Sequence, residues 1–260
     1  MRTRLGQNFL IDNNIVRRIA DACGDTAGKS VIEIGPGKGV LTEELAKRYR
    51  SVIAVELDGG LCAGLAKKFA GSGNVEIIHA DFLEWDLPAA GKFDFAANIP
   101  YYISTPIVEK VLGYGNRDTA VFMVQKEVAE RMAAAEGSKK RGVLSVACQS
   151  AGEVKIIFDV PAQCFRPAPE VTSSVVRFRR TAAEITGFDR KKLMEAVKAS
   201  FSHRRKTISN SLALALGIGK SRISEMVSGC GISPAERPEN IPIDKFLALS
   251  RVLPSSDDKK

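Results

Sequence analysis

Residues 30–39 read SVIEIGPGKG, in which a short apolar run leads into three glycines, and a helical pattern begins at Val40. Glycines permit a tight turn and let a ligand approach the backbone closely. Gly35, Gly37 and Gly39 follow a G-x-G-x-G spacing, whereas the dinucleotide fingerprint places its third glycine one residue later. The Lys-Ser/Thr ending of a nucleoside triphosphate loop is also absent. The stretch therefore predicts a strand, a ligand-binding loop and a helix, and it disfavours both of these nucleotide fingerprints.

Apolar runs and amphipathic segments alternate along the first two-thirds of the chain. Five runs have the composition of buried parallel strands, at 30–35, 52–57, 75–80, 93–99 and 120–125. Helical segments occur at 40–49, 60–69, 105–112 and 127–135, and two later strands at 155–160 and 173–180 flank a loop at 161–170 without a helix. The pattern predicts a doubly wound α/β sheet with right-handed crossovers. Seven strands that end in a hairpin-like pair match the Rossmann-like arrangement of class I methyltransferases.

The sequence changes character across residues 181–187. Helical segments follow at 190–202, 207–216, 220–229 and 243–253, and glycines punctuate them. We therefore expect a catalytic domain at 1–181, a small all-helical domain at 182–254, and a tail at 255–260 that is disordered.

Composition describes a globular protein of the cytoplasm. Of the 260 residues, 45% are hydrophobic and 26% charged, and no apolar run is long enough to cross a membrane. The N-terminus is basic but lacks the apolar stretch of a secretory signal. The five cysteines are scattered and never occur in Cys-x-x-Cys spacing, which argues against a disulfide framework or a zinc site. We expect them to be small buried hydrophobes.

A net charge of +8 and a pI near 9.3 favour a polyanionic partner. Basic residues cluster at Arg2/Arg4, Lys139–Arg141, Arg177/Arg179/Arg180, Arg190–Lys192 and His203–Lys206. Any one cluster is explained by a solvated face. Five of them in one chain favour nucleic acid as the partner.

Four polar residues lie at the carboxyl ends of successive predicted strands and are expected at one edge of the sheet, where such folds bind ligands. Glu33 precedes the glycine loop and suits a cationic methionine moiety better than a pyrophosphate. Glu56 lies 21 residues after Gly35, where a carboxylate can accept from both ribose hydroxyls. Asp81 can accept from an adenine amine, and Asn98 lies where a sulfonium methyl would project. The set predicts S-adenosylmethionine (SAM) as cofactor, although Glu56 or Asp81 alone is equally well a surface carboxylate or a helix cap.

Asn98-Ile99-Pro100-Tyr101 has the composition of a clamp for an exocyclic amine on a base. The lone pair of the adenine N6 amine is delocalised, so a site that methylates it needs acceptors for its N–H protons and a flat surface for the ring. The Asn98 side-chain oxygen and the Ile99 carbonyl can accept, Pro100 stiffens the turn, and Tyr101 can stack. Alone, the tetrapeptide is an ordinary Asn-x-Pro turn. Its place after the fourth strand favours the clamp, which requires no metal.

With these residues in place, the chain resembles the KsgA (RsmA) family of ribosomal RNA adenine N6,N6-dimethyltransferases from Leu5 to about Leu253. The resemblance is carried by GQNFL at 6–10, the glycine loop, VELD at 55–58, AD at 80–81, NIPY at 98–101, QKEVAER at 125–131, FRPAPEV at 165–171 and FSHRRKT at 201–207. The combination is highly specific, although the single motifs are not.

The resemblance implies that Asn8 and Leu10 join Gly35, Gly37, Glu56, Asp81 and Asn98 as SAM contacts. It also implies that Phe165 covers the second face of the base, although a loop aromatic packed on the core explains this residue as well. The implied substrate is a pair of adjacent adenosines in the 3′-terminal hairpin of small-subunit rRNA, inside an assembling particle. Arg204, Arg205 and Lys206 are expected to contact rRNA phosphates. We expect a monomer.

Two alternatives remain at this stage. One is an Erm-type enzyme that methylates large-subunit rRNA and confers antibiotic resistance, because its clamp is similar. The other is an assembly factor whose binding matters more than its catalysis. The chain also departs from the family at Lys38, Tyr102, Glu136 and Lys139–Arg141, which affects the expected RNA contacts.

Overall fold

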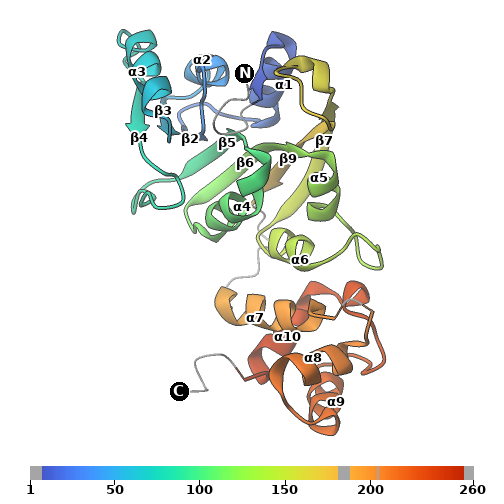
Figure 1. The fold of residues 1–260 in the computed structure, drawn as a ribbon. Coiled ribbons are helices and arrows are strands. Elements are labelled where there is room, and N and C mark those ends of the chain that lie inside the picture. Colours follow the sequence, from blue (N-terminus) through green and yellow to red (C-terminus); the bar gives the residue numbers. More distant parts are fainter. Residues whose placement is uncertain (1–7, 181–187, 204, 255–260) are drawn as a thin grey trace. The chain divides into compact units, whose positions relative to one another are not determined.

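The computed structural model describes residues 8–180, 188–203 and 205–254, which divide into two compact units (Figure 1). The first unit takes the described residues of Met1–Ala129 and Gly152–Thr181, and the second those of Glu130–Ala151 and Ala182–Lys260. The predicted domain boundary at 181/182, the tail at 255–260 and Arg204 lie outside the described residues. The units differ from the predicted division because 130–151 groups with the C-terminal helices.

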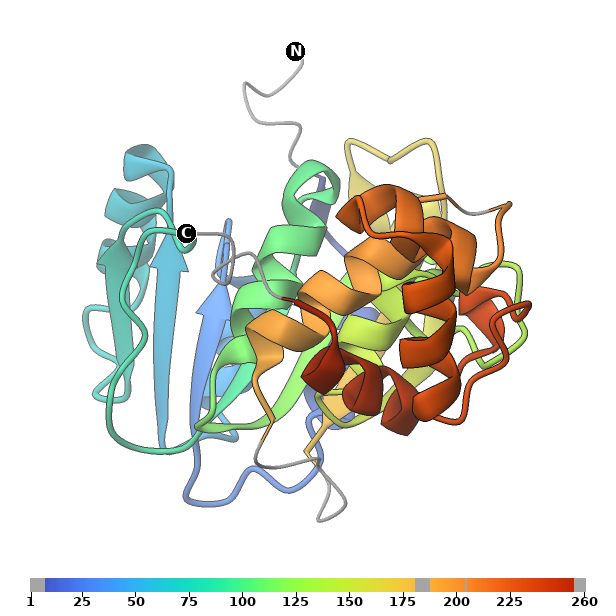
Figure 2. The ribbon, with the colours of Figure 1, turned by 90° about the horizontal axis from the view of Figure 1, so that it is seen from below.

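A seven-stranded sheet forms the centre of the first unit. Its strands are β2 (Ser30–Ile34), β3 (Ser51–Glu56), β4 (Val75–His79), β5 (Phe93–Asn98), β6 (Arg117–Gln125), β7 (Glu153–Val160) and β9 (Ser173–Arg179). They lie in the order β4-β3-β2-β5-β6-β9-β7. The first five pair in parallel, as the aligned arrows of β2, β3 and β4 show in Figure 2, and β9 is antiparallel to both β6 and β7. The predicted Rossmann-like sheet with a terminal hairpin-like pair is confirmed.

Helices cover both faces of this sheet (Figure 1). They are α1 (Asn13–Ala22), α2 (Val40–Ala46), α3 (Gly59–Lys68), α4 (Ser104–Gly113) and the first turn of α5 (Lys126–Met132), which continues into the second unit. Successive residues of a strand point to opposite faces. Val31, Ala96 and Val121 therefore join one core cluster with α1 and α2. Phe122 and Phe178 pack on each other on the opposite face at a ring-centroid distance of 5.7 Å. Burial on both faces explains why these strands are nearly continuous apolar runs.

Helix α1 is absent from the sequence prediction, although its signals are present. Asp12 caps its N-terminus by accepting from the backbone N–H groups of Asn14 (2.8 Å) and Ile15 (3.2 Å). Ile15, Val16 and Ile19 form its buried stripe. An Asp cap before apolar residues at helical spacing is a usable signal.

The N-terminal strand β1 (Phe9–Leu10) pairs with β8 (Phe165–Arg166) in a small antiparallel sheet. The loop expected to lack a helix contains a 3₁₀ turn at Ala162–Cys164, and the Ile11 N–H donates to the Cys164 carbonyl at 2.9 Å. No local pattern predicts this pairing, because its two strands are more than 150 residues apart. It fixes Phe9 and Leu10 against the loop that precedes β9 in the first unit.

The second unit is helical. It contains α6 (Val143–Gln149), α7 (Arg190–Phe201), α8 (Ile208–Leu216), α9 (Lys220–Gly229) and α10 (Ile243–Val252), of which only α6 was not predicted. Val146 of α6 packs in the same core as Leu193 and Phe246, which explains why 130–151 belongs to this unit. Within the described ranges, no helix has the length and apolar character needed to cross a membrane.

Arg141 is buried, unlike its exposed neighbours Lys139 and Lys140 in the predicted basic cluster. Its Nη1 donates to the carbonyls of Ile241 (2.6 Å) and Glu239 (2.9 Å), and its Nη2 lies 3.8 Å from Glu136. Burial lowers the pKa of this guanidinium. Arg141 therefore joins the 130–151 segment to the loop before α10 and is not available to a nucleic acid.

Replacing Arg141 with alanine is expected to destabilise the second unit by about 2 kcal/mol, because it opens a cavity and leaves carbonyls without a donor. Hydrogen exchange of the full chain measures this as faster exchange in α6 and α10. Lys220→Ala on α9, which removes an exposed charge from the same unit, is the matched control and should leave the exchange of α6 and α10 unchanged. Equal protection in Arg141→Ala and the wild type would show that the buried charge costs as much as its hydrogen bonds contribute.

Candidate functional site

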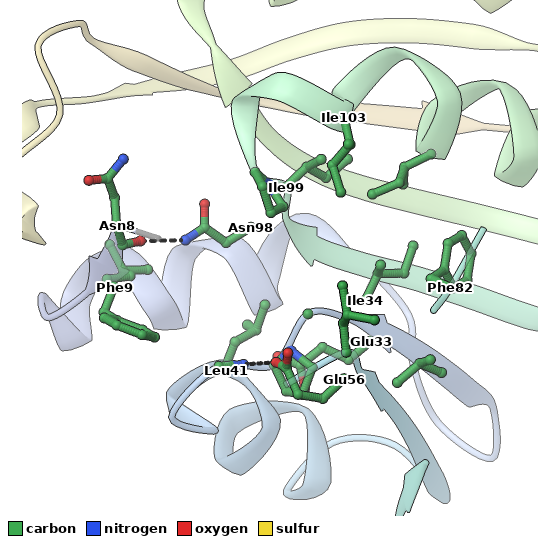
Figure 3. Close-up of a pocket in the computed structure, with 18 of the residues that line it drawn as sticks. Asn8, Phe9, Glu33, Ile34, Leu41, Glu56, Phe82, Asn98, Ile99 and Ile103 are labelled. Atoms are coloured by element: carbon green, nitrogen blue, oxygen red, sulfur yellow. Dashed lines mark hydrogen bonds between the residues drawn. The ribbon is translucent and has the colours of Figure 1, made fainter. Parts of the chain in front are cut away.

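A pocket lies at the carboxyl edge of the sheet in the first unit (Figure 3). It is lined by the N-terminal strand, the glycine loop and the ends of β3, β4 and β5. All seven predicted cofactor residues line it, namely Asn8, Leu10, Gly35, Gly37, Glu56, Asp81 and Asn98. Ile99, Pro100 and Tyr101 line it too. The parallel strands thus bring together residues that the sequence places far apart.

The glycine loop requires glycine at its third position. Gly39 has φ = +73°, which L side chains rarely adopt, and it precedes the first turn of α2. A Cβ on Gly39 would lie 2.7 Å from Leu65 Cδ2 and 2.9 Å from Phe69 Cε2. The close approach of α3 to this loop therefore excludes a side chain.

Glu56 is buried at the end of β3, with both carboxylate oxygens held by backbone N–H groups. Gly37 donates to Oε2 at 3.0 Å and Asp58 donates to Oε1 at 3.0 Å. A carboxylate oxygen has a second acceptor site after one such bond. Glu56 is therefore fixed in direction and still able to accept from two hydroxyls, as the predicted ribose contact requires.

Glu33 lies beside Glu56 in the pocket wall (Figure 3) and is only 2% exposed. Its Oε2 has no hydrogen-bond partner among the described residues. Burial, which has the largest effect, and the negative charge of Glu56 together raise the pKa of this carboxyl to about 8, although the nearby Thr42 hydroxyl lowers it. A buried polar atom without a partner costs free energy, so its presence in a pocket indicates a ligand group that pairs with it. An ammonium group such as that of methionine fits this requirement, which supports SAM.

Asp81 is exposed after β4, and its Oδ1 accepts from the Leu83 N–H at 2.8 Å. This bond is part of a turn in which the N–H groups of Glu84 and Trp85 donate to the Asp81 carbonyl. The sequence offered a cap and a ligand contact as alternative roles for Asp81. The two roles are compatible, because Asp81 caps the turn and also lines the pocket.

Asn98 ends β5, and its Nδ2 donates to the backbone carbonyl of Asn8 at 3.1 Å (Figure 3). Because the amide nitrogen is engaged, Oδ1 is left as the acceptor. The backbone of Ile99 is fixed in turn by a 3.1 Å bond from its N–H to the Met123 carbonyl. The N-terminal segment therefore orients the side chain that the sequence predicts to be catalytic.

Tyr101 follows in a 3₁₀ turn and is half-buried. Its hydroxyl is 2.7 Å from the Ser173 Oγ on β9. Burial raises the pKa of the phenol, so Tyr101 is neutral. A ring held at both ends is suited to stacking and not to acid–base chemistry.

Phe165 and the basic residues are placed differently. Phe165 is 3% exposed, pairs with Leu10 across the small sheet, packs in the core and does not line the pocket. Its contact with a base stays a prediction. Arg205 and Lys206 are exposed between α7 and α8, in the second unit.

Phe9 and Lys38 are two of the pocket residues that the sequence analysis did not assign to the site. Lys38 Nζ lies 4.8 Å from the centroid of the Phe9 ring, and a Cβ on Gly37 would approach that ring to 3.2 Å. Phe9 therefore covers the glycine loop. Its place in the GQNFL segment was the available signal. For Lys38, the only signal in the sequence was that this residue departs from the family pattern.

Comparison with known proteins agrees with this geometry. The family model of ribosomal RNA adenine dimethylases matches residues 1–254. Proteins named ribosomal RNA small subunit methyltransferase A are 41% identical in Geobacillus thermodenitrificans, covering 96% of this chain and 89% of that protein, and 42% identical in Moorella thermoacetica, covering 97% and 92%.

Solved structures extend the comparison. A dimethyladenosine transferase from Plasmodium falciparum superposes with a TM-score of 0.81 at 24% identity, over 93% of this chain and 95% of that one, and shows the shared fold. The 23S rRNA methyltransferase ErmE gives a TM-score of 0.72 at 29% identity, over 94% and 98%. The chain belongs to the ribosomal RNA adenine dimethylase family, whose members are SAM-dependent methyltransferases.

Proposed function

We propose that the protein dimethylates N6 of two adjacent adenosines in the 3′-terminal hairpin of small-subunit rRNA. The observation that carries the proposal is Asn98, whose amide nitrogen is engaged by Asn8 while its oxygen is left as an acceptor. Relatives named for the small subunit reach 41–42% identity, whereas the large-subunit enzyme ErmE reaches 29%. These values favour the small subunit over the Erm-type alternative.

The pocket supplies one contact for each part of the cofactor. Glu33 pairs with the ammonium, Glu56 accepts from the ribose hydroxyls, and Asp81 accepts from the adenine amine. Gly35 and Gly37 allow the ligand to approach the loop, and Asn8 and Leu10 complete the wall. When bound, SAM supplies an electrophilic methyl group.

The clamp acts on the substrate base. The target adenosine leaves its stack and enters the pocket, where Tyr101 stacks on it. Asn98 Oδ1 and the Ile99 carbonyl accept the amine protons, which favours a tetrahedral nitrogen with its lone pair available. Orientation supplies most of the rate. A second transfer requires the monomethylated amine to rotate, which gives up one of these two acceptors.

The proposal also covers the location of the protein, its oligomeric state and the particle on which it acts. The protein acts in the cytoplasm as a monomer on an assembling small-subunit particle, and Arg205 and Lys206 contact rRNA phosphates. Binding to immature particles is a second candidate role, favoured by the net charge of +8.

Incubation with tritiated SAM and undermethylated ribosomal particles tests the proposal. Small-subunit particles should acquire label, and mapping should place it on two adjacent adenosines near the 3′ end of the rRNA. Large-subunit particles should remain unlabelled. Label confined to the large subunit would overturn the proposal in favour of the Erm-type alternative.

Removing the charges of Arg205 and Lys206 should weaken particle binding and reduce the slope of log K against log salt by about 1–2, because fewer counterions are released. Filter binding at several salt concentrations measures the slope. The matched control is Arg17→Ala/Lys67→Ala, which removes the same charge from exposed positions on α1 and α3. Equal slopes in both double variants would show a general effect of net charge.

A further inference from the structure

Tyr102 is a second aromatic residue at the pocket, directly after the clamp. It lines the pocket and is 64% exposed, more than any other large hydrophobic side chain in the described residues. The Tyr102 side chain makes no hydrogen bond and no ring contact with the other described residues. Its ring therefore contributes little to the core, and its exposure has a cost in apolar surface.

The backbone holds Tyr102 in a rigid turn. The 3₁₀ turn spans Tyr101–Ile103, the Ile103 N–H donates to the Pro100 carbonyl at 3.1 Å, and Ser104 Oγ donates to the Tyr101 carbonyl at 3.2 Å. Pro100 has φ fixed at −56°. Tyr102 is therefore presented in a defined position, as a stacking surface requires, and not on a free loop.

The position of Tyr102 suits a neighbouring nucleotide better than the target. Consecutive Cα atoms are about 3.8 Å apart, so Tyr102 begins within one residue of the ring that stacks on the target base. Adjacent nucleotides are covalently linked, and when one adenosine occupies the pocket its neighbour lies at the rim. An exposed ring at the rim meets that neighbour.

We propose that Tyr102 stacks on the nucleotide next to the target adenosine and positions the strand for both methylations. The inference rests on the proposed function. Stacking uses the face of a base and tolerates any base. It does not use the N6 amine, so a dimethylated adenosine can occupy the rim as well as an unmodified one. The same surface therefore serves while either adenosine of the pair is in the pocket.

Kinetics with undermethylated small-subunit particles test this role. Tyr102→Ala should raise KM for the particle by roughly 5- to 150-fold, the loss expected for one stacked base, with kcat within about 2-fold. Tyr102→Phe should retain wild-type KM because it keeps the ring. Mass spectrometry of the RNA should show more pairs with one modified adenosine for Tyr102→Ala. SAM affinity, measured by calorimetry, should be unchanged, and Ile156→Ala on β7 controls for loss of an exposed apolar side chain.

Three results would overturn the inference: a wild-type KM for Tyr102→Ala, an equal loss in Tyr102→Phe, or weaker SAM binding in Tyr102→Ala. The first would leave the ring without a role, the second would assign the effect to the hydroxyl, and the third would place Tyr102 in the cofactor site. None of these affects the proposed function. That proposal fails separately, if the wild-type protein does not label the small subunit.

Discussion

Asn98→Ala is expected to lower kcat for adenosine methylation by roughly 100- to 1,000-fold, with KM for the particle nearly unchanged. The acceptor Oδ1 matters most when the amine nitrogen becomes tetrahedral, so its loss affects the transition state more than substrate binding. Single-turnover transfer from tritiated SAM to undermethylated particles measures the rate of the chemical step.

The matched control is Asn116→Ala, which removes a similar amide from the surface of the same unit. SAM binding must be measured alongside, because Asn98 also holds the Asn8 carbonyl and its loss can loosen the N-terminal strand. Transfer near the wild-type rate in Asn98→Ala would show that the clamp is wrongly assigned. Loss of SAM binding without loss of kcat would assign Asn98 to cofactor binding alone.

Much of the fold follows from local patterns. The five parallel strands are buried on both faces, so each appears as an apolar run, and the structure places every one within three residues of its predicted limits. Helices α7, α8, α9 and α10 were equally predictable, since an Asp cap bounds α7, glycines bound α8 and α9, and prolines bound α10. Helix α6 was not, because five of its seven residues are buried and its apolar positions form no stripe.

The candidate site was predictable where topology alone assembles it. Carboxyl ends of parallel strands share one edge, so Glu56, Asp81 and Asn98 had to lie close together. Contacts that depend on the pairing of strands far apart in the sequence were not predictable. The bond from Asn98 to Asn8 and the inward turn of Phe165 both follow from the pairing of β1 with β8, which joins residues with no shared local pattern.

Clusters of basic residues in the sequence were the least reliable predictor of which side chains are exposed. Lys139, Lys140 and Arg141 form one basic cluster in the sequence, yet Arg141 is buried against the carbonyls of Glu239 and Ile241. Sequence gives charge but not the direction of a side chain. Burial of such a residue depends on a loop about 100 residues away.

Glu33→Gln is expected to make the protein more stable at pH 8 and a weaker binder of SAM. The pKa of Glu33 is about 8 in the folded protein against an ordinary value of 4.5. Between these values the folded state keeps a proton that the unfolded state has lost, so the free energy of unfolding falls as pH rises from 4.5 to 8. Glutamine removes this titration. The stability of the variant relative to wild type should therefore increase by about 3 kcal/mol between pH 5 and pH 8.

Urea unfolding at both pH values measures that difference, with Glu76→Gln on β4 as an exposed control that should follow the wild type. If the free energy of unfolding changed with pH in the wild type as it does in Glu33→Gln, Glu33 would be charged in the free pocket.

The affinity of the wild-type protein for SAM should rise with pH, whereas its free energy of unfolding should fall. An ammonium beside the buried carboxyl favours the charged form, so binding releases a proton and wild-type affinity rises by up to about tenfold per pH unit between pH 5 and pH 7. Glu33→Gln should bind roughly 10- to 100-fold more weakly at pH 7, without this rise, because the charge-assisted hydrogen bond is lost. Calorimetry in buffers of different ionisation enthalpy counts the released proton. Equal affinity of the variant and wild type at pH 7 would remove Glu33 from the cofactor site, and the buried, unpaired oxygen would then be only a cost to stability.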